Sequence, residues 1–298
     1  MVTVKAPGSC GELVQGTIDG ENFLITCPVN IFSEVTVIPS TRPSEKYDYI
    51  KVRTAIAKTL QYLNITNVHF DFHISSQLPI GKGMASSSAD ISSACQAVAL
   101  YHGKTLTPAE LADIALEIEP TDAIFYPGIL MFDHVTGHTR KYLGTPPDID
   151  IAVFDVGGEI DTLHFNQRND LPVLNREKEK DVRLALDLVT KGFATHDVKL
   201  IGQGATISAL ANQSILIKPN LEGIIDLSKH FNAAGVNVAH SGSVLGVLFD
   251  RNSNKDLIPC ISAICKTYPD AKYLKTVKII SGGLQIWEGD SNRWAKCF

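Results

Sequence analysis

The chain of 298 residues is 44% hydrophobic and 20% charged, a composition typical of a soluble globular protein with one large or two medium domains. Its formal net charge of −5 and pI near 6.0 disfavour nucleic acid or an anionic membrane surface as the main partner. No apolar run reaches about 18 residues, and the first residues lack the basic and apolar regions of a secretory signal, so we expect neither a membrane span nor export. Six scattered cysteines without a C-x-x-C pair indicate reduced thiols in a cytoplasmic protein, and Cys10 alone lies in a Gly-rich segment.

The first half of the chain alternates predicted strands and helices. An amphipathic helix is expected over residues 49–63, because Val52, Ile56, Leu60 and Leu63 recur on one face. Alternating and β-branched runs predict strands at 2–6, 21–30, 33–40, 69–77, 126–134 and 149–158. The second and third of these strands are expected to be joined at a break around residues 30–32.

The clearest helix start lies at Thr107. Thr107 fits the N-cap position, Pro108 the first helical position and Glu110 the third, which together form a capping box. Pro120 is expected to end this helix, because proline lacks the backbone N–H that a helix interior needs.

The character of the sequence changes after about Thr162, where a charged loop leads into the second half. A helix closed by Gly192 is expected after residue 168, a strand–glycine turn–strand unit at 236–250, and a last strand or hairpin at 274–289. Further helices are expected at 197–214, 219–235 and 254–269. We expect a boundary within residues 160–172, which gives two α+β domains, 1–165 and 166–298, that meet in a cleft.

The stretch "QLPIGKGMASSSADISSACQAVALYHG", residues 77–103, places glycines and serines directly before a helical apolar pattern. A helix start rich in small residues is suited to an anion, because its first N–H groups have no partner within the helix. A plain Gly/Ser turn before a core helix is the alternative. The stretch is not a Walker A loop, since Gly83 follows Lys82, and it is not a dinucleotide fingerprint, since Ser86 replaces the third glycine. Gly103 is expected to cap the end of the helix.

Three separated segments share this small-residue character: "APGSCGELVQG" at 6–16, "PIGKGMASSSA" at 79–89 and "AHSGSVLGVLF" at 239–249. In this order they resemble the three motifs of the GHMP kinase superfamily, in which the second reads P-x-G-x-G-L-G-S-S-A-A. The resemblance implies an α+β fold, with an amino-terminal domain like domain 2 of ribosomal protein S5 and a ferredoxin-like carboxy-terminal domain.

Within the superfamily, "PGSCGELVQG" and "EPTDAIFYPGILMFDH" are most similar to the branch that phosphorylates L-threonine. That branch makes L-threonine O-3-phosphate for adenosylcobalamin synthesis. A homoserine kinase or another small-alcohol kinase is the alternative activity. A silent binding protein is disfavoured, because Ser87, Glu119 and Asp122 are all present.

The resemblance implies ATP and Mg²⁺ as cofactors. ATP would bind the loop formed by Pro79, Gly81, Lys82, Gly83, Met84, Ala85, Ser86, Ser87 and Ser88, with Met84 as a hydrophobic plug beneath it. Mg²⁺ prefers hard oxygen ligands, here Ser87 and Glu119, with Ser86 and Glu117 as alternatives. Asp122 would accept or orient the proton of the attacking hydroxyl, whereas its local alternative is an N-cap for the next segment.

The resemblance also implies substrate contacts for a small-molecule amino acid from Ser9, Cys10, Gly11, Glu12, Ser241 and Gly242. Glu12 could bind the substrate ammonium, and Lys5 or Arg53 its carboxylate. Two departures from the superfamily pattern stand out. Ser9 replaces a first-motif lysine, for which Lys82 is one substitute, and Val244 replaces a third-motif glycine.

His134 and His138 have the i, i+4 spacing of some metal sites on helices. The intervening "DHVTGH" is more typical of a turn between strands, so we do not expect a zinc site there.

Overall fold

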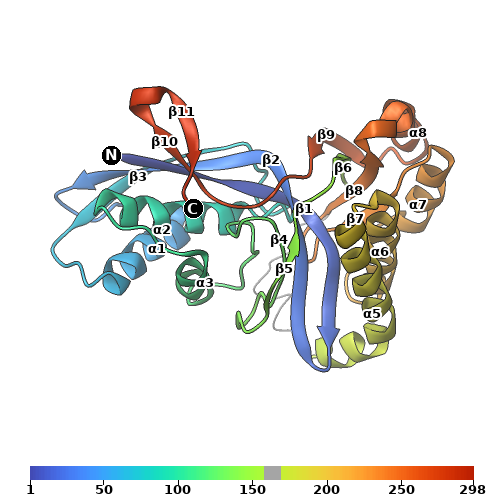
Figure 1. Ribbon diagram of the computed structural model, residues 1–298, viewed down its shortest axis with the longest axis horizontal. Coiled ribbons are helices and arrows are strands. Elements are labelled where there is room, and N and C mark those ends of the chain that lie inside the picture. Colours follow the sequence, from blue (N-terminus) through green and yellow to red (C-terminus); the bar gives the residue numbers. More distant parts are fainter. Residues whose placement is uncertain (158–168) are drawn as a thin grey trace.

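The computed structural model describes residues 1–157 and 169–298 (Figure 1). The strands in this part of the chain are β1 Val2–Ile18, β2 Glu21–Ser40, β3 His69–Ser76, β4 Ile129–Phe132, β5 Arg140–Gly144, β6 Ile149–Asp155, β7 Gly235–Val238, β8 Val244–Asp250, β9 Lys272–Lys278, β10 Gln285–Glu288 and β11 Arg293–Lys296. The helices are α1 Ile50–Tyr62, α2 Ser86–Tyr101, α3 Pro108–Leu116, α5 Leu171–Thr195, α6 Val198–Ala211, α7 Leu221–His230 and α8 Leu257–Thr267. None of these helices is both long and apolar enough to cross a membrane.

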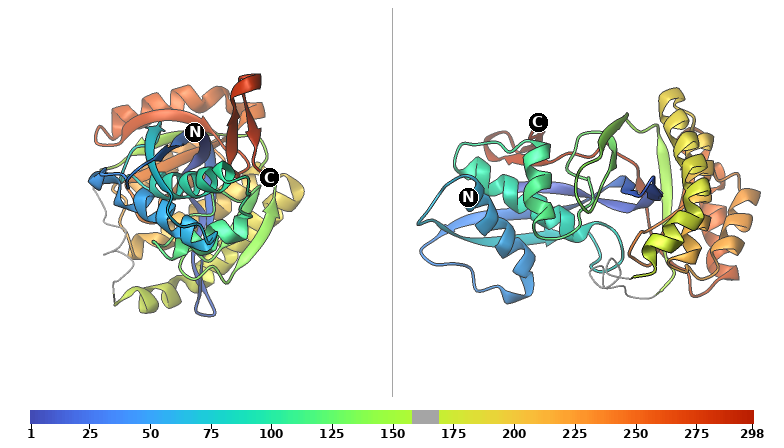
Figure 2. Two further views of the ribbon diagram at one scale, coloured as in Figure 1. Left: turned by 90° about the vertical axis from the view of Figure 1, so that its left-hand side faces the viewer. Right: turned by 90° about the horizontal axis from the view of Figure 1, so that it is seen from below.

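The longest feature is the hairpin of β1 and β2, which runs through both halves of the molecule (Figures 1 and 2). Its two-residue turn is Asp19-Gly20, with positive φ at both residues, as a tight hairpin turn requires. The strand expected at 2–6 is present but runs on to Ile18, and the break expected at 30–32 was wrong, because β2 is continuous. Register shifts between residues 7 and 14 let β1 bend and continue through its glycines, and β2 bends with it.

Antiparallel pairing joins all eleven strands of the described residues into one sheet. Its main order is β5-β4-β2-β1-β7-β8-β6-β9, while β3 pairs with β2, and β10 pairs with β1 and β11. Helix α2 packs on β1 and β2, with α1 and α3 against it, whereas α5 and α6 pack on the other end of β1 (Figure 1). Of the strand or hairpin expected at 274–289, strands are present as β9 and β10, but they do not form a hairpin, because β9 pairs with β6 and β10 pairs with β1 and β11.

Several local predictions are confirmed. The capping box at Thr107 forms with Glu110, and Gly103 follows α2 with φ +68°. Helix α3 ends at Leu116, before Pro120. Gly192 does not close α5, which runs on to Thr195. A Cβ at Gly192 would lie 2.6 Å from Ile201 Cγ1, so this glycine serves the close crossing with α6.

The expected boundary between residues 165 and 166 lies outside the described residues. Strands from each side of this boundary pair with strands from the other side. β6 lies between β8 and β9, and β10 returns to β1. The larger hydrophobic cluster likewise joins β1, β2 and α2 to α5 and α6. The α+β class is as expected, and the two halves share one sheet.

Candidate active site

The small-residue loop before α2 forms one wall of a cleft. Ala85 takes a left-handed conformation, and α2 begins at Ser86 with no side chain capping its first N–H groups. These groups and the positive end of the helix dipole remain available to an anion. The cavity here measures about 290 Å³ and is lined by Lys51, Ile80, Gly81, Gly83, Met84, Ala85, Ser86, Ser87, Ser88, Glu119, Pro120, Asp122 and Ser241.

The first and third motifs hold this loop from beneath. The N–H of Ser9 donates to the Met84 carbonyl at 3.0 Å, and the N–H of Val244 donates to the Lys82 carbonyl at 3.2 Å. A Cβ at Gly242 would lie 2.2 Å from the Lys82 oxygen, so glycine is needed for this approach. Met84 is 1% exposed, which confirms that it packs under the loop.

Ser87 and Glu119, predicted as metal ligands, lie together. The Ser87 hydroxyl donates to Glu119 Oε1, and Lys51 Nζ donates to Glu119 Oε2 at 2.6 Å. Glu119 is only 7% exposed, so it is not a solvated helix-end residue. Its rival Glu117 is exposed and pairs with Lys58 at 2.7 Å, away from the cavity lining.

Asp122 sits beside this pair. Its backbone N–H donates to Ser88 Oγ at 3.1 Å, and the N–H of Thr121 donates to the His134 carbonyl at 3.0 Å, which fixes the segment. Burial and then the charge of Glu119 raise the pKa of Asp122 from its usual 3.8 to about 6. The helix-cap alternative was wrong, because a turn and β4 follow Asp122 rather than a helix.

Glu12 reaches the same place from the bent part of β1. It pairs with Thr26 of β2 and Val238 of β7, and the register shifts on either side of it re-aim the strand. Glu12 is 4% exposed, and its Oε2 has no hydrogen-bond partner among the described residues. Burial, followed by the charge of Asp122, raises the pKa of Glu12 well above its usual range.

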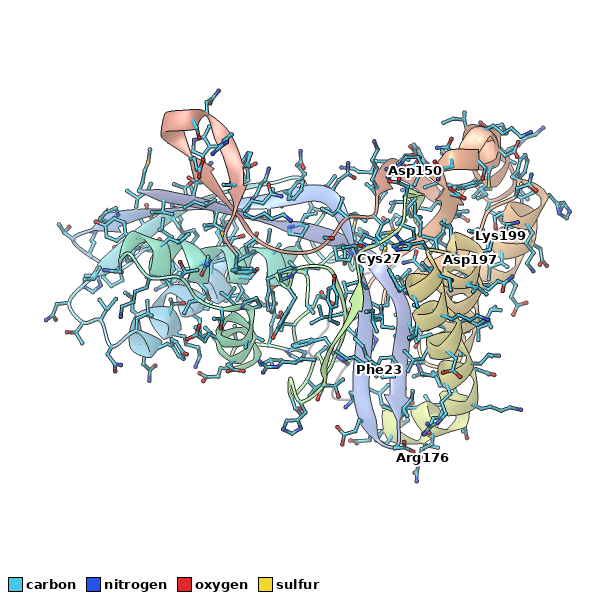
Figure 3. The ribbon with its side chains drawn as sticks, in the orientation of Figure 1. Phe23, Cys27, Asp150, Arg176, Asp197 and Lys199 are labelled. Atoms are coloured by element: carbon cyan, nitrogen blue, oxygen red, sulfur yellow. The ribbon has the colours of Figure 1, made fainter. Side chains whose placement is uncertain are left out.

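Beyond the carboxylates the cleft continues toward the hairpin. A small space of about 50 Å³ lies between Glu12, Asp122, His134 and His240. It adjoins a cavity of about 460 Å³ that shares both histidines and extends to Arg176 of α5. Figure 3 shows Arg176 at the hairpin end of that helix, and Phe23 and Cys27 along the hairpin itself.

The two cleft histidines lie against each other, with ring centroids 5.0 Å apart. Burial lowers the pKa of His134 to about 4, and burial with nearby positive charge lowers the pKa of His240 well below its usual value. Both rings are therefore neutral at pH 7 and can act as hydrogen-bonding groups.

Some predicted residues do not line the cleft. Ser9 and Cys10 are buried in β1, and the backbone of Gly11 packs against Val238, so none of the three is among the described lining residues. Gly242 supports the loop instead, while Ser241 does line the cleft.

Three basic residues predicted to contact phosphate or substrate do not line the cleft in this structure. Lys82 forms an ion pair with Asp155 at 3.2 Å. Lys5 lies over the rings of Phe32 and Trp294. Arg53 stacks on Tyr47 and lines a separate pocket. Pro79, predicted as part of the ATP loop, does not line the cavity either.

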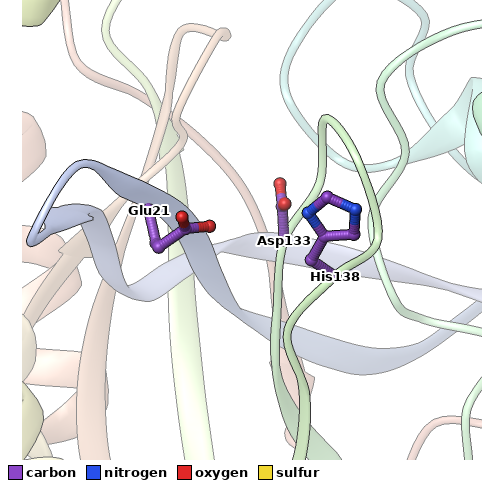
Figure 4. Close-up of side chains that lie close together, drawn as sticks. All are labelled: Glu21, Asp133 and His138. Atoms are coloured by element: carbon purple, nitrogen blue, oxygen red, sulfur yellow. The ribbon is translucent and has the colours of Figure 1, made fainter.

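Glu21, Asp133 and His138 bring their ligand atoms within 4.8 Å of one another near the β4–β5 turn (Figure 4). The Asp133 carboxylate already accepts the N–H groups of Val135 and Thr136, so it caps this turn. Glu21 and His138 are exposed. His134 does not belong to this group, because it points into the cleft instead.

Sequence reasoning missed Lys51 and the histidine pair as parts of the cleft. Lys51 and Lys58 are seven residues apart on the polar side of α1, so one face carries both, and each pairs with a glutamate after α3. That spacing was the available signal. Nothing local marks His240, whose neighbour His134 comes from a distant turn.

The chain is similar to known proteins over most of its length. Residues 49–126 match the model for the GHMP kinases N terminal domain, and residues 189–271 match the GHMP kinases C terminal model. An L-threonine kinase of Salmonella typhimurium is 32% identical over 256 residues, 84% of each chain. An L-threonine kinase of Citrobacter freundii is 33% identical over 263 residues, 85% of this chain and 88% of that protein.

Solved structures agree in fold. A mevalonate kinase superposes with a TM-score of 0.72 at 16% identity, covering 95% of this chain and all of that one. A homoserine kinase from Cytophaga hutchinsonii also gives a TM-score of 0.72 at 16% identity, covering 96% of each chain.

Proposed function

The chain belongs to the GHMP kinase family and is thus an ATP-dependent kinase of small-molecule alcohols, and from this premise we propose that its substrate is L-threonine. The observation that supports this choice of substrate is Glu12, a buried carboxylate that lies beside Asp122 and has an oxygen without a hydrogen-bond partner among the described residues. An amino acid offers an ammonium group for it, whereas mevalonate does not. Similarity to two L-threonine kinases supports the same choice. The product, L-threonine O-3-phosphate, would serve cobalamin synthesis, as the sequence resemblance implies.

We place the ATP phosphates in the cavity at the start of α2. The first N–H groups of this helix carry no side-chain cap, and the preceding glycines allow close approach of an anion. The reacting phosphoryl group would then lie between this loop and Asp122, which lines the same cavity.

The residues present fit a magnesium ion. Ser87 and Glu119 supply two oxygen donors that already touch, and Glu119 already attracts the ammonium of Lys51. Bound there, Mg²⁺ would neutralise charge on the phosphates. We propose Ser87 and Glu119 as its ligands, with Ser86 lining the cavity nearby.

Asp122 would accept or orient the proton of the threonine hydroxyl. With a pKa of about 6 it is ionised near neutral pH, yet basic enough to share that proton. Glu12 would pair with the substrate ammonium, which favours its charged form and offsets the effect of burial. His134 and His240 line the other side of this space and would contact the rest of the amino acid.

The test is steady-state kcat/KM with Mg-ATP for L-threonine, L-serine, L-homoserine and mevalonate, with products identified by mass. Serine lacks one methyl group, so we expect roughly 10- to 200-fold preference for threonine over serine. Homoserine carries its hydroxyl one carbon further out, and a misplacement of about 1 Å can cost on the order of 10²-fold. Best turnover of homoserine would instead make the chain a homoserine kinase, and turnover of mevalonate alone would exclude an amino-acid substrate.

A further inference from the structure

The phosphate loop shares its cavity with one lysine. Among the described residues that line this cavity, Lys51 of α1 is the only lysine or arginine, and two carboxylates, Glu119 and Asp122, lie with it. A bound triphosphate would bring several more negative charges. The start of α2 supplies only about half a positive charge, and the proposed Mg²⁺ supplies two. Together they do not balance a triphosphate and two carboxylates, so phosphate binding calls for a further cation beside the metal.

The two other positions considered for that cation do not provide it. Ser9 stands where several superfamily members have a lysine, and it is buried in β1. Lys82 lies in the loop itself, but its ammonium forms an ion pair with Asp155 of β6, and Lys82 is absent from the cavity lining.

Lys51 also has an unfavourable position with respect to the helix dipole. It lies near the N-terminal end of α1, directly after the 3-10 turn Tyr47–Tyr49, where a positive charge is disfavoured. Lys58, on the same face of α1, instead forms an ion pair with Glu117 outside the cleft. Departures from local preference of this kind are common at functional sites.

We propose that Lys51 contacts the phosphate groups of bound ATP and takes the place of the missing first-motif lysine. In the ligand-free protein, Glu119 holds the Lys51 ammonium at 2.6 Å, at the edge of the loop cavity, and the side chain is 44% exposed. On binding, the ammonium exchanges a carboxylate oxygen for phosphate oxygens, and no covalent bond changes. This inference rests on the proposed ATP site but not on the proposed amino-acid substrate.

The test is ATP affinity, measured by titration calorimetry with and without Mg²⁺, for the Lys51→Met, Lys51→Arg and Lys58→Met variants. Lys58→Met is the matched control, because it removes the other bridge between α1 and the segment after α3. We expect Lys51→Met to weaken ATP binding about 10-fold or more, Lys51→Arg to retain most of the affinity, and Lys58→Met to change it less than about 2-fold. AMP affinity should fall much less than ATP affinity in Lys51→Met.

Unchanged ATP affinity in Lys51→Met would overturn the proposal, and so would equal losses in Lys51→Met and Lys58→Met. A second readout needs no variant: ATP should protect Lys51 from amine acylation more than it protects Lys58, as measured by mass spectrometry. Equal labelling of Lys51 with and without ATP would also overturn it. ATP binding through Lys51 without turnover of threonine would refute only the substrate proposal.

Discussion

At the scale of single residues, the cleft concentrates carboxyl groups that burial keeps partly protonated. Burial and then the charge of Glu119 raise the pKa of Asp122, while burial and then the charge of Asp122 raise the pKa of Glu12. A proton acceptor works best when its pKa lies near the working pH. The arrangement is therefore suited to a hydroxyl substrate that loses its proton during transfer.

We predict that Asp122→Ala and Asp122→Asn both lower kcat by about 10²- to 10⁴-fold while ATP affinity changes little. Steady-state kinetics and calorimetry measure the two effects. In the unmodified protein, kcat/KM should fall as the pH drops through about 6, because Asp122 becomes protonated. Near-normal kcat in Asp122→Ala would exclude catalysis by Asp122, and activity in the Asn variant alone would indicate orientation rather than proton transfer.

The same residue should reduce stability at neutral pH. The pKa of Asp122 rises from 3.8 to about 6 on folding, so the native state binds more protons than the unfolded state between these values. The free energy of unfolding therefore contains a term that is present below pH 3.8 and is lost as the pH rises through 6. We predict that Asp122→Asn raises the free energy of unfolding by on the order of 1–3 kcal/mol near pH 7.5, and by much less near pH 4.

Urea denaturation at both pH values measures this difference. Asp187→Asn, on the exposed side of α5, is the control and should change stability by less than about 0.5 kcal/mol. An Asp122→Asn variant that is no more stable than the unmodified protein near pH 7.5 would show that Asp122 ionises without a cost from burial.

At the scale of elements, glycines let the loop and the third motif touch. Gly83 has φ +80°, and a Cβ there would lie 2.4 Å from the Ala239 Cβ, whereas a Cβ at Gly81, with φ +72°, would meet nothing within 4 Å. We predict that Gly81→Ala costs about 1–2 kcal/mol of stability from backbone strain alone. Gly83→Ala should cost about 1–3 kcal/mol more, because the loop must also move. If urea unfolding shows equal losses of stability in Gly81→Ala and Gly83→Ala, the loop moves away from Ala239 at little cost.

Bound ATP should order the same element. We predict slower amide hydrogen exchange across residues 81–88 with saturating Mg-ATP, because phosphate oxygens would accept those N–H groups. Exchange followed by mass spectrometry measures it, with α7, which contributes no residue to the cavity lining, as an internal reference. Unchanged exchange in the loop would contradict the phosphate site.

At the scale of the whole molecule, one sheet and one large hydrophobic cluster join the two halves. Val182 and Phe193 of α5 share that cluster with Phe72 and Ile91 of the amino-terminal half. We propose that the domains 1–165 and 166–298 fold as one cooperative unit. A fragment of residues 1–157 should therefore remain unfolded or aggregate.

Full-length unfolding should show a single transition. Far-UV circular dichroism reports on the whole chain. Tryptophan fluorescence reports on the β10–β11 hairpin, where the ring centroids of Trp287 and Trp294 lie 5.3 Å apart. We expect the two midpoints to coincide. Two separated transitions, or a fragment of residues 1–157 that unfolds cooperatively, would show that the halves are independent.

Local interactions explain which parts could be predicted from the sequence. The capping box at Thr107, the cap at Gly103 and the loop before α2 depend on residues a few positions apart. Strand lengths in the hairpin could not be predicted in this way. The bulges near Glu12 are stabilised by pairing with β2 and β7, and a glycine-rich strand resembles a loop when its partners are unknown.

The sequence by itself determined the three motifs, their order and the helix that follows the Gly/Ser loop, and these already indicated a phosphate-binding kinase fold. Tertiary structure alone decided which side chains meet. It brings Glu119 rather than Glu117 to Ser87, and turns Lys82 toward Asp155. The physical reason is that helix starts and turns are set by neighbours in the chain. The Lys51–Glu119 contact spans 68 residues and exists only because α1 and α3 pack on the same helix, α2.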